Sequence, residues 1–384
     1  MESRYSVIDG DALSYNILQV RNRVGSIKIM AIVKANAYGH GIVECAQILA
    51  SQGADYFGVA LIQEAITLRN AGITLPILVL GGIIAEQIPL FLSYNIEFMA
   101  SSIDKLLAIN SAAKIYKKIA KVHLKIDTGL GRIGVRCTHA DNFFMAALAL
   151  PSIEIVGVAS HFATSDHQDS SFMAEQCEKF RQATEFFTHH GLPMPLRHIA
   201  NSGAIMQYSE SYFDMVRPGI MLYGVYPQSW MSHLILLKPV MSLYARIVYF
   251  KVVQLGQSVS YGLTWKATYD TRVITLPIGY GDGYPRALSN AGYVLMNGNT
   301  YPIVGMICMD QMMVDIAQDT AYCGDEVVLI GSSGNLTITI NKLVDCYGGS
   351  PYEFLVTLND RIIRRYKQNN IKLLQLNQII EKEL

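Results

Sequence analysis

The sequence predicts an α/β protein in which a (β/α)8 barrel of the TIM type is followed by a mainly β C-terminal domain. The chain has 384 residues, more than the roughly 250–300 at which a single core usually stops growing. Short apolar runs alternate with helical patterns up to residue 237, and beyond residue 239 strand-like runs follow one another between turns. We therefore predict a barrel over 11–238 and a β-rich domain over 239–384, which residues 1–10 join.

The barrel is predicted from eight runs rich in apolar and β-branched residues, the composition of buried parallel strands. The runs are Lys28–Val33, Tyr56–Ala60, Ile77–Leu80, Glu97–Ala100, Lys121–Ile126, Ile153–Val158, Leu196–Ile199 and Phe213–Val216. Stretches with helical spacing of apolar residues lie between them, among them Ile62–Asn70, Ile103–Lys114 and Phe172–His189. Eight strands with eight connections predict a closed barrel, whose functional groups gather at the carboxyl ends of the strands.

The second domain is predicted from strand-like runs separated by Gly, Asn and Asp. The runs are Leu243–Val253, Thr271–Pro277, Tyr293–Asn297, Tyr301–Val304, Met312–Ile316 and Glu326–Ile330. Asn297-Gly298 separates two of them, and this dipeptide favours the tight turn of a β-hairpin. The segments Asn341–Tyr347 and Asn359–Leu384 have a mixed or helical pattern.

Composition argues against several classes of partner. The 31 Lys and Arg residues balance the 31 Asp and Glu residues, so nothing indicates binding to nucleic acid. The N-terminus lacks the apolar region of a secretory signal, and no apolar run approaches the ~20 residues of a membrane helix. The six cysteines contain no CxxC pair and the nine histidines no HxxxH or HExxH spacing. We therefore expect reduced thiols, a cytoplasmic location and no metal site.

The first predicted strand leads directly into VKANAYGHG, residues 33–41. Lys34 then lies at the carboxyl end of a barrel strand, where the catalytic groups of such barrels are found. Burial at this point would depress the pKa of the amine, as an imine-forming lysine requires. Position alone leaves an alternative, because the long side chain can also extend to solvent beyond the end of the strand.

Nine sequence blocks carry a resemblance that runs over nearly the whole chain. They are VKANAYGHG (33–41), LKIDTGLGRIG (124–134), SHFATSD (160–166), ANSGA (200–204), VRPGIMLYG (216–224), SVSYGLTW (258–265), GYGDGYPR (279–286), ICMDQMMVD (307–315) and PYE (351–353). In this order they resemble the alanine racemases, pyridoxal-phosphate enzymes with a barrel followed by a β domain. The resemblance implies an isomerase that interconverts L- and D-alanine, acts as a homodimer and serves D-alanine biosynthesis, which supplies a peptidoglycan precursor.

The resemblance also assigns residues to the cofactor. Lys34 would carry pyridoxal 5'-phosphate as an internal aldimine, and Arg217 would face the pyridine nitrogen, where a cation disfavours protonation of the ring. Arg132 would contact the phenolic oxygen of the cofactor and the carboxylate of the substrate. The other cofactor-binding residues that it implies are Tyr38, His161, Asn201, Ser202, Gly219, Ile220 and Tyr352.

Two bases on opposite faces of the substrate Cα are implied in the same way, and these are Lys34 and Tyr261. A free tyrosine has a pKa of about 10 and is a poor base at neutral pH. Tyr261 would therefore depend on a hydrogen-bonded chain through His161 and Arg217 to act as a catalytic base.

Part of each site would come from the β domain of a second subunit. The residues that the resemblance places there are Tyr261, Tyr280, Met309 and Asp310. Substrate binding would fall to Arg132, Met309 and Asp310, with the backbone amide of Met309 beside the substrate carboxylate. Tyr280 and Tyr352 would narrow the entrance, which excludes larger side chains and water.

Two features of the sequence leave alternatives open. Lys125 matches a lysine that some alanine racemases carry as a carbamate, which would hold Arg132, but an unmodified lysine paired with an acid is equally compatible with the sequence. Gly281 replaces a more usual alanine, and Gly349-Ser350 replace a common Thr-Ile next to Tyr352. The smaller Gly349-Ser350 pair, next to the entrance tyrosine, would widen the channel and weaken discrimination between alanine and serine. A serine or broad-specificity racemase is therefore the alternative activity, ahead of a decarboxylase of the same architecture or a non-catalytic cofactor-binding protein.

Overall fold

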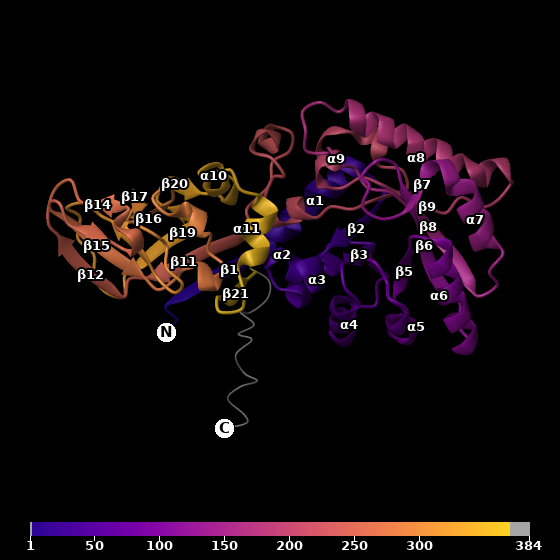
Figure 1. The fold of residues 1–384 in the computed structure, drawn as a ribbon, viewed down its shortest axis with the longest axis horizontal. Coiled ribbons are helices and arrows are strands. Elements are labelled where there is room, and N and C mark those ends of the chain that lie inside the picture. Colours follow the sequence, from indigo (N-terminus) through magenta and orange to yellow (C-terminus); the bar gives the residue numbers. More distant parts are fainter. Residues whose placement is uncertain (1, 369–384) are drawn as a thin grey trace, which may run out of the picture.

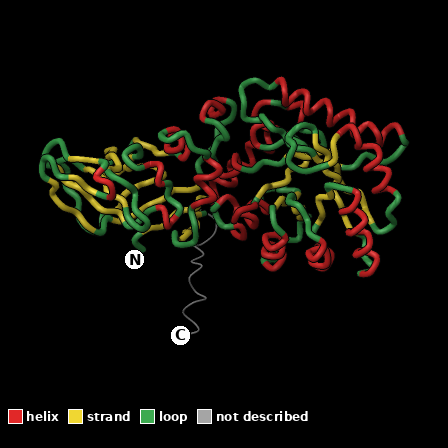
Figure 2. The backbone as a smooth tube through the Cα atoms, viewed as in Figure 1, coloured by secondary structure: helices red, strands yellow, loops and turns green. Residues whose placement is uncertain are grey.

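The computed structural model describes residues 2–368 and contains two domains that lie side by side along its long axis (Figure 1). One is a barrel of strands surrounded by helices, and the other consists mainly of strands (Figure 2). Helix α11, Pro351–Thr357, lies where the two domains meet. Among the helices of residues 2–368, none combines the length and the apolar character that crossing a membrane requires.

Eight parallel strands form the barrel, in the spatial order β10-β2-β3-β4-β5-β6-β8-β9. They are β2 (Lys28–Ile32), β3 (Tyr56–Val59), β4 (Ile77–Val79), β5 (Glu97–Ala100), β6 (Ala120–Asp127), β8 (Ile153–Ala159), β9 (Leu196–His198) and β10 (Met215–Val216), and the short β7 (Val135–Arg136) pairs with β6. The gap between β9 and β10 is bridged where the amide of Arg217 donates to the carbonyl of Ala200 at 2.9 Å. The barrel is thus nearly closed, and the eight predicted strands are confirmed.

Helices cover the outside of this barrel (Figure 2). They are α1 (Gly10–Val24), α3 (Ile42–Ser51), α4 (Ile62–Asn70), α5 (Ile88–Tyr94), α6 (Ile103–Ile115), α7 (Ala140–Leu148), α8 (Ser171–His189) and α9 (Ser202–Gln207), and the short α2 (Lys34–Tyr38) follows β2. The carboxylate of Asp9 caps α1 by accepting from the amides of Asp11 and Ala12, each at 2.9 Å. Strands β3, β4 and β5 are buried at every residue, as parallel strands covered on both faces should be.

The second domain is built on a ten-stranded sheet in the order β12-β15-β18-β17-β16-β19-β11-β1-β21, with β20 beside β19. Its strands are β1 (Arg4–Asp9), β11 (Met241–Arg246), β12 (Tyr249–Val253), β15 (Thr271–Leu276), β16 (Tyr293–Met296), β17 (Asn299–Val304), β18 (Met312–Asp315), β19 (Glu326–Ser333), β20 (Leu336–Ile338) and β21 (Ile363–Lys367); β13 (Ser258–Val259) pairs with β14 (Trp265–Lys266), and α10 (Ile340–Asp345) precedes α11. Strand β1 lies between β11 and β21, so the two ends of the described chain meet in this sheet. Asn297 and Gly298, with φ of 52° and 76°, form the predicted hairpin turn between β16 and β17.

Three predicted segments differ from the structure. The run Leu243–Val253 is two strands, because the chain turns at residues 247–248 and β12 pairs with β15 far from β11. The last barrel strand begins at Met215 rather than Phe213, whose φ of 48° is left-handed. Within the C-terminal segment that was expected to be mixed or helical, 363–367 is strand β21, and residues 369–384 lie outside the described residues.

Candidate active site

A cavity of about 570 Å³ opens at the carboxyl ends of the barrel strands. All the residues that the sequence assigned to the cofactor line it, together with Lys125. They are Lys34, Tyr38, Lys125, Arg132, His161, Asn201, Ser202, Arg217, Gly219, Ile220 and Tyr352. Tyr352 comes from α11 of the second domain and the others from the barrel. The fold thus gathers into one cavity side chains that are far apart in the sequence.

Lys34 begins a tight left-handed turn directly after β2. Residues 35–38 all have φ between 52° and 54°, a conformation that costs a non-glycine residue about 1–2 kcal/mol. Side chains hold the turn: the Glu64 carboxylate accepts from the amide of Ala35 at 2.6 Å, and the Asn36 carbonyl oxygen accepts from the amide of Ile42 at 2.9 Å. The turn brings both Lys34 and Tyr38 to the cavity wall.

The environment of Lys34 favours its neutral amine. Burial is the largest cause of the lowered pKa of Lys34, the positive charge of Arg132 lowers it further, and the carboxylate of Glu64 acts in the opposite direction. A neutral amine is the form that attacks a carbonyl group to make an imine. The buried position of Lys34 therefore favours the neutral amine that an imine-forming lysine needs.

Arg217 is buried among hydrogen-bond acceptors. Its two terminal nitrogens donate to the backbone carbonyl oxygens of residues 160, 198 and 199 at 2.6–3.0 Å. They also donate to Nδ1 of His198 at 2.7 Å and to Nδ1 of His161 at 3.1 Å. Burial, with a contribution from Arg132, lowers the pKa of Arg217 to about 9, so the guanidinium is charged at neutral pH.

A chain of buried polar side chains extends from Arg217 into the barrel. Because arginine can only donate, Nδ1 of His198 accepts and its proton lies on Nε2. That Nε2 lies 2.8 Å from Nδ1 of His123, whose own Nε2 lies 2.8 Å from a carboxylate oxygen of Glu97. Every donor meets an acceptor when both imidazoles are neutral and protonated on Nε2. Burial and then the charge of Arg217 hold the pKa of His198 well below its usual value, in agreement with this pattern.

The same reasoning fixes the proton on His161. Its Nδ1 accepts from Arg217, so its proton lies on Nε2 and is available to a group in the cavity. Burial, followed by the charge of Arg217, holds the pKa of His161 well below its usual value. His161 is therefore a neutral hydrogen-bond donor at the cavity wall.

Hydroxyl and amide groups gather at another part of the cavity. The Ser202 hydroxyl accepts from the amide of Gly219 at 2.8 Å. A Cβ atom on residue 219 would lie only 2.6 Å from the Tyr38 hydroxyl oxygen, so glycine permits this close approach. Such neutral donors can hold a phosphate group without a lysine clamp.

The cavity also holds more positive charge than its protein neighbours neutralise. Lys34, Lys125, Arg132 and Arg217 line it, and none of the ion pairs among residues 2–368 involves any of the four. Burial, followed by the charges of Arg217 and Arg132, holds the pKa of Lys125 well below its usual value. An anionic ligand would relieve this repulsion. A reactive amine, cationic side chains and neutral phosphate donors together fit pyridoxal phosphate.

Four predicted site residues lie elsewhere, on the surface of the second domain. They are Tyr261, Tyr280, Met309 and Asp310, and none of them lines the cavity. Tyr261 is 72% and Met309 53% exposed. Their loops are joined, since the amide of Tyr280 donates to the carbonyl of Cys308 at 3.1 Å and the Ser260 hydroxyl donates to the carbonyl of Met306 at 2.5 Å.

The two glycine positions that depart from the family pattern do not leave open space. A Cβ atom on Gly349 would collide with the ring of Tyr347, and one on Gly281 would collide with the guanidinium of Arg361. Larger neighbouring side chains occupy the space. The wider channel expected from Gly349-Ser350 stays a prediction, although the ring of Tyr347 occupies the space beside Gly349.

The sequence analysis did not single out Glu97, His123 and His198. Each is a buried residue of a barrel strand, β5, β6 or β9. A titratable residue in such a strand must find a partner, because burying it alone is costly, and this was the available signal. The identity of the partners depends on the pairing of strands and could not be read from the runs themselves.

Comparison with known proteins identifies the family. The family model described as the N-terminal domain of alanine racemase matches residues 8–227. The model described as the C-terminal domain of alanine racemase matches residues 240–366. The chain belongs to the alanine racemase family. A relative named alanine racemase from Halothermothrix orenii is 40% identical, over 94% of this chain and 96% of the relative. The alanine racemase family depends on pyridoxal phosphate, so the predicted fold class, isomerase activity and cofactor are confirmed.

Solved structures agree with this assignment. The alanine racemase of Clostridium difficile 630 is 34% identical, covers 98% of this chain and 98% of its own, and superposes with a TM-score of 0.91. The alanine racemase of Bartonella henselae, described with covalently bound pyridoxal phosphate, is 29% identical, covers 96% of this chain and 100% of its own, and has a TM-score of 0.87.

Among the described residues, no group of three or more His, Cys, Asp or Glu side chains is arranged to hold a metal ion.

Proposed function

We propose that this alanine racemase moves the proton on the substrate Cα between two bases, Lys34 and the Tyr261 of a second subunit. The observation that carries the proposal is the amine of Lys34, whose pKa burial lowers, in the same cavity as Arg217 and His161. The proposal assigns a chemical role to each of the residues that line this cavity.

Pyridoxal phosphate, when bound, withdraws electrons from the Cα of an amino acid and so weakens its bond to hydrogen. Lys34 would hold the cofactor through its amine, Arg217 would face the ring nitrogen and Arg132 the phenolic oxygen. The residues proposed to bind the phosphate or to lie around it are Tyr38, Asn201, Ser202, Gly219, Ile220 and Tyr352. The close approach of Gly219 to the Tyr38 hydroxyl and the bond from its amide to Ser202 support this division.

Arg217 would act as a fixed cation beside the ring. Its terminal nitrogens already donate to His198, His161 and backbone carbonyls, which keeps its position rigid. With a pKa of about 9, it retains its proton at neutral pH and disfavours protonation of the facing nitrogen. A weaker electron sink restrains side reactions such as transamination.

The two bases would act from opposite faces of the substrate Cα. The lowered pKa of Lys34 lets its Nζ accept a proton near neutral pH. A phenol is a poor base at neutral pH unless its phenolate is stabilised by roughly 4 kcal/mol relative to the phenol. The Nε2–H of His161, with Arg217 behind it, can donate to that phenolate and supply part of this energy.

A homodimer follows from the separation of the two bases. Tyr261 lies outside the cavity of its own chain, and its loop is exposed next to the one that carries Met309. In the proposed dimer, domain 239–384, with residues 1–10, contributes these loops to the partner's barrel, domain 11–238. Met309 and Asp310 would then join Arg132 at the substrate carboxylate, while Tyr280 and Tyr352 would narrow the entrance.

Two further assignments belong to this proposal. A carbamate on Lys125 would turn a buried cation into an anion beside Arg132, and the lowered pKa of this lysine supports it, because the neutral amine is the form that reacts with carbon dioxide. All six cysteines are free thiols, which supports a cytoplasmic location. Supply of D-alanine for peptidoglycan is the biological role that we expect.

Subunit exchange tests the shared site. Lys34→Ala and Tyr261→Ala should each be inactive, but after mixing and exchange one site of every hybrid dimer contains both bases. Random exchange makes half of the dimers hybrids, so about a quarter of the wild-type activity should return. Each variant exchanged with itself is the control. Persistent inactivity after proven exchange would mean that each site is built from one chain.

A further inference from the structure

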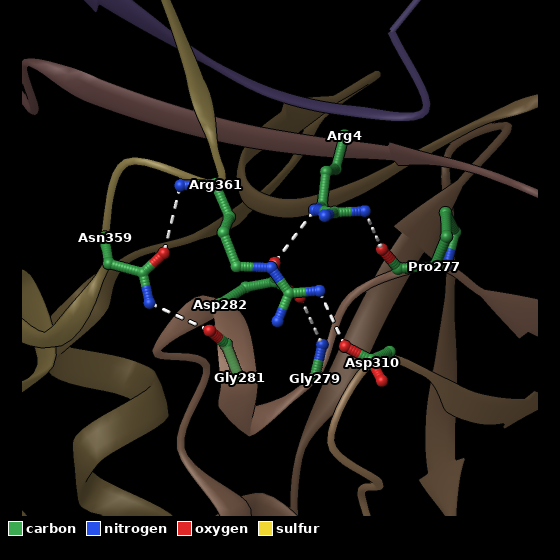
Figure 3. A network of polar contacts seen from close by, with 8 residues as sticks. All are labelled: Arg4, Pro277, Gly279, Gly281, Asp282, Asp310, Asn359 and Arg361. Carbon is green, nitrogen blue, oxygen red and sulfur yellow. Dashed lines mark hydrogen bonds and ion pairs between the residues drawn. The ribbon is translucent and has the colours of Figure 1, made fainter.

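The carboxylate of Asp282 joins separate parts of the second domain (Figure 3). Asp282 is 0% exposed. One of its oxygens lies 2.9 Å from Nε of Arg4 and 3.2 Å from Nε of Arg361, and the other accepts from the amide of Gly279 at 3.0 Å. Arg4 is the first residue of β1, and Arg361 shortly precedes β21. Asp282 therefore places a buried negative charge beside the guanidinium of Arg361.

Arg361 extends from this buried carboxylate to an exposed one. Its Nη2 lies 2.6 Å from an oxygen of Asp310, whose side chain is 58% exposed. The side chain of Asn359 supports the same arrangement: its carbonyl oxygen accepts from the amide of Arg361 at 3.0 Å, and its nitrogen donates to the carbonyl of Gly281 at 2.8 Å. A planar guanidinium can bridge two carboxylates in a fixed geometry, whereas the point charge of a lysine cannot.

Gly281 provides the room that this bridge needs. A Cβ atom on residue 281 would collide with Nη1 of Arg361 and lie 2.9 Å from the carbonyl oxygen of Met309. The amide of Gly281 also donates to that carbonyl at 2.7 Å. The glycine that departs from the usual alanine is thus matched to an arginine that uses the vacated space and to the backbone of Met309.

Met309 and Asp310 lie in the exposed connection between β17 and β18. Backbone bonds from residues 280 and 281 hold one side of it. Among residues 2–368, the ion pair with Arg361 is the one that fixes the side chain of Asp310. The connection is therefore tied to the domain interior through Arg361 and Asp282.

We propose that Arg361 is a positioning residue for substrate binding, and that it acts through Asp310 to fix the Met309 amide at the substrate carboxylate. Gly281 belongs to the same arrangement, because a Cβ atom on residue 281 would displace the guanidinium from this place. The inference rests on the proposed role of Met309 in the partner's site. It names a residue outside the cavity, Arg361, as a cause of how accurately the substrate carboxylate is held.

The test compares Arg361→Gln, Arg361→Lys and Gly281→Ala with Arg181→Gln, which removes a similarly exposed arginine–carboxylate pair on α8. Amide hydrogen exchange of segment 305–311 in the holoenzyme is the first measurement, and KM and kcat for alanine are the second. We expect faster exchange and a KM raised about 3- to 10-fold, with kcat within about twofold, in Arg361→Gln and Gly281→Ala. Arg361→Lys should fall between wild type and Arg361→Gln, and Arg181→Gln should match wild type in both measurements.

Asp310→Asn completes the test as a double-mutant cycle. If Arg361 acts through Asp310, the double variant should be no worse than either single variant. Unchanged exchange and unchanged KM in Arg361→Gln would overturn the inference, as would fully additive effects in the cycle. Faster exchange without any change of KM would also overturn it, because Met309 would then not depend on the bridge. Loss of the proposed function is a separate outcome, seen as failure of the hybrid dimers to regain activity.

Discussion

Replacement of Glu97 by leucine tests the buried hydrogen-bond chain that runs from Arg217 through His198 and His123. Glu97 is 4% and His123 0% exposed, and Nε2 of His123 donates to the carboxylate at 2.8 Å. Leucine occupies a similar volume but accepts no hydrogen bond, so it leaves a buried N–H without a partner. A hydrogen bond to a charged group contributes about 1.5–3 kcal/mol. We therefore expect the free energy of unfolding to fall by about 2–3 kcal/mol.

Glu97→Gln is the matched control, because its amide keeps a carbonyl oxygen that can accept from His123. It should lose only about 1 kcal/mol, the difference between a hydrogen bond to a charged group and an ordinary neutral one. Equilibrium denaturation in guanidinium chloride, at one protein concentration for all forms, measures both differences. Equal losses for the two variants, or no loss with leucine, would refute the chain of donors and acceptors that ends at Glu97.

Two other predictions concern the lysines of the cavity. Borohydride reduction of the pyridoxal-phosphate-loaded protein should attach the cofactor permanently to Lys34, and a labelled peptide containing any other lysine would contradict the assignment. With carbon-13 bicarbonate, the protein should give a carbamate signal in carbon NMR that is missing in Lys125→Ala. An identical signal in the variant would place the carbamate elsewhere, and no signal in the wild type would leave Lys125 as an unmodified, buried amine.

The barrel was readable from the sequence because buried parallel strands are continuous apolar runs, and their ends fix where functional groups lie. Lys34 follows such a run directly, so its place at the end of a barrel strand was predictable from the sequence, while position alone left open whether its side chain is buried or extends to solvent. The nine blocks then carried the other cavity residues. By contrast, Leu243–Val253 reads as one strand, and only its different partners along the sheet divide it into β11 and β12.

Other features depend on contacts between distant parts of the chain. The chain Glu97–His123–His198–Arg217 joins four strand regions, and the spacing of these residues in the sequence carries no sign of it. The sequence likewise does not indicate that Arg361 occupies the space beside Gly281. Both cases are pairings across the fold, which one-dimensional patterns do not encode.

The central claim is that Lys34 and Tyr261 act on opposite faces of the substrate, and deuterium exchange in Tyr261→Phe tests it most directly. Phenylalanine keeps the ring and removes the titratable oxygen, so racemisation should fall by at least the ~10²–10⁴-fold typical of a positioned proton-transfer group. Tyr280→Phe is the control and should exchange both enantiomers. In heavy water, Tyr261→Phe should still exchange the α-proton of D-alanine through Lys34, while exchange from L-alanine collapses. Equal residual exchange from both enantiomers would contradict the two-base account.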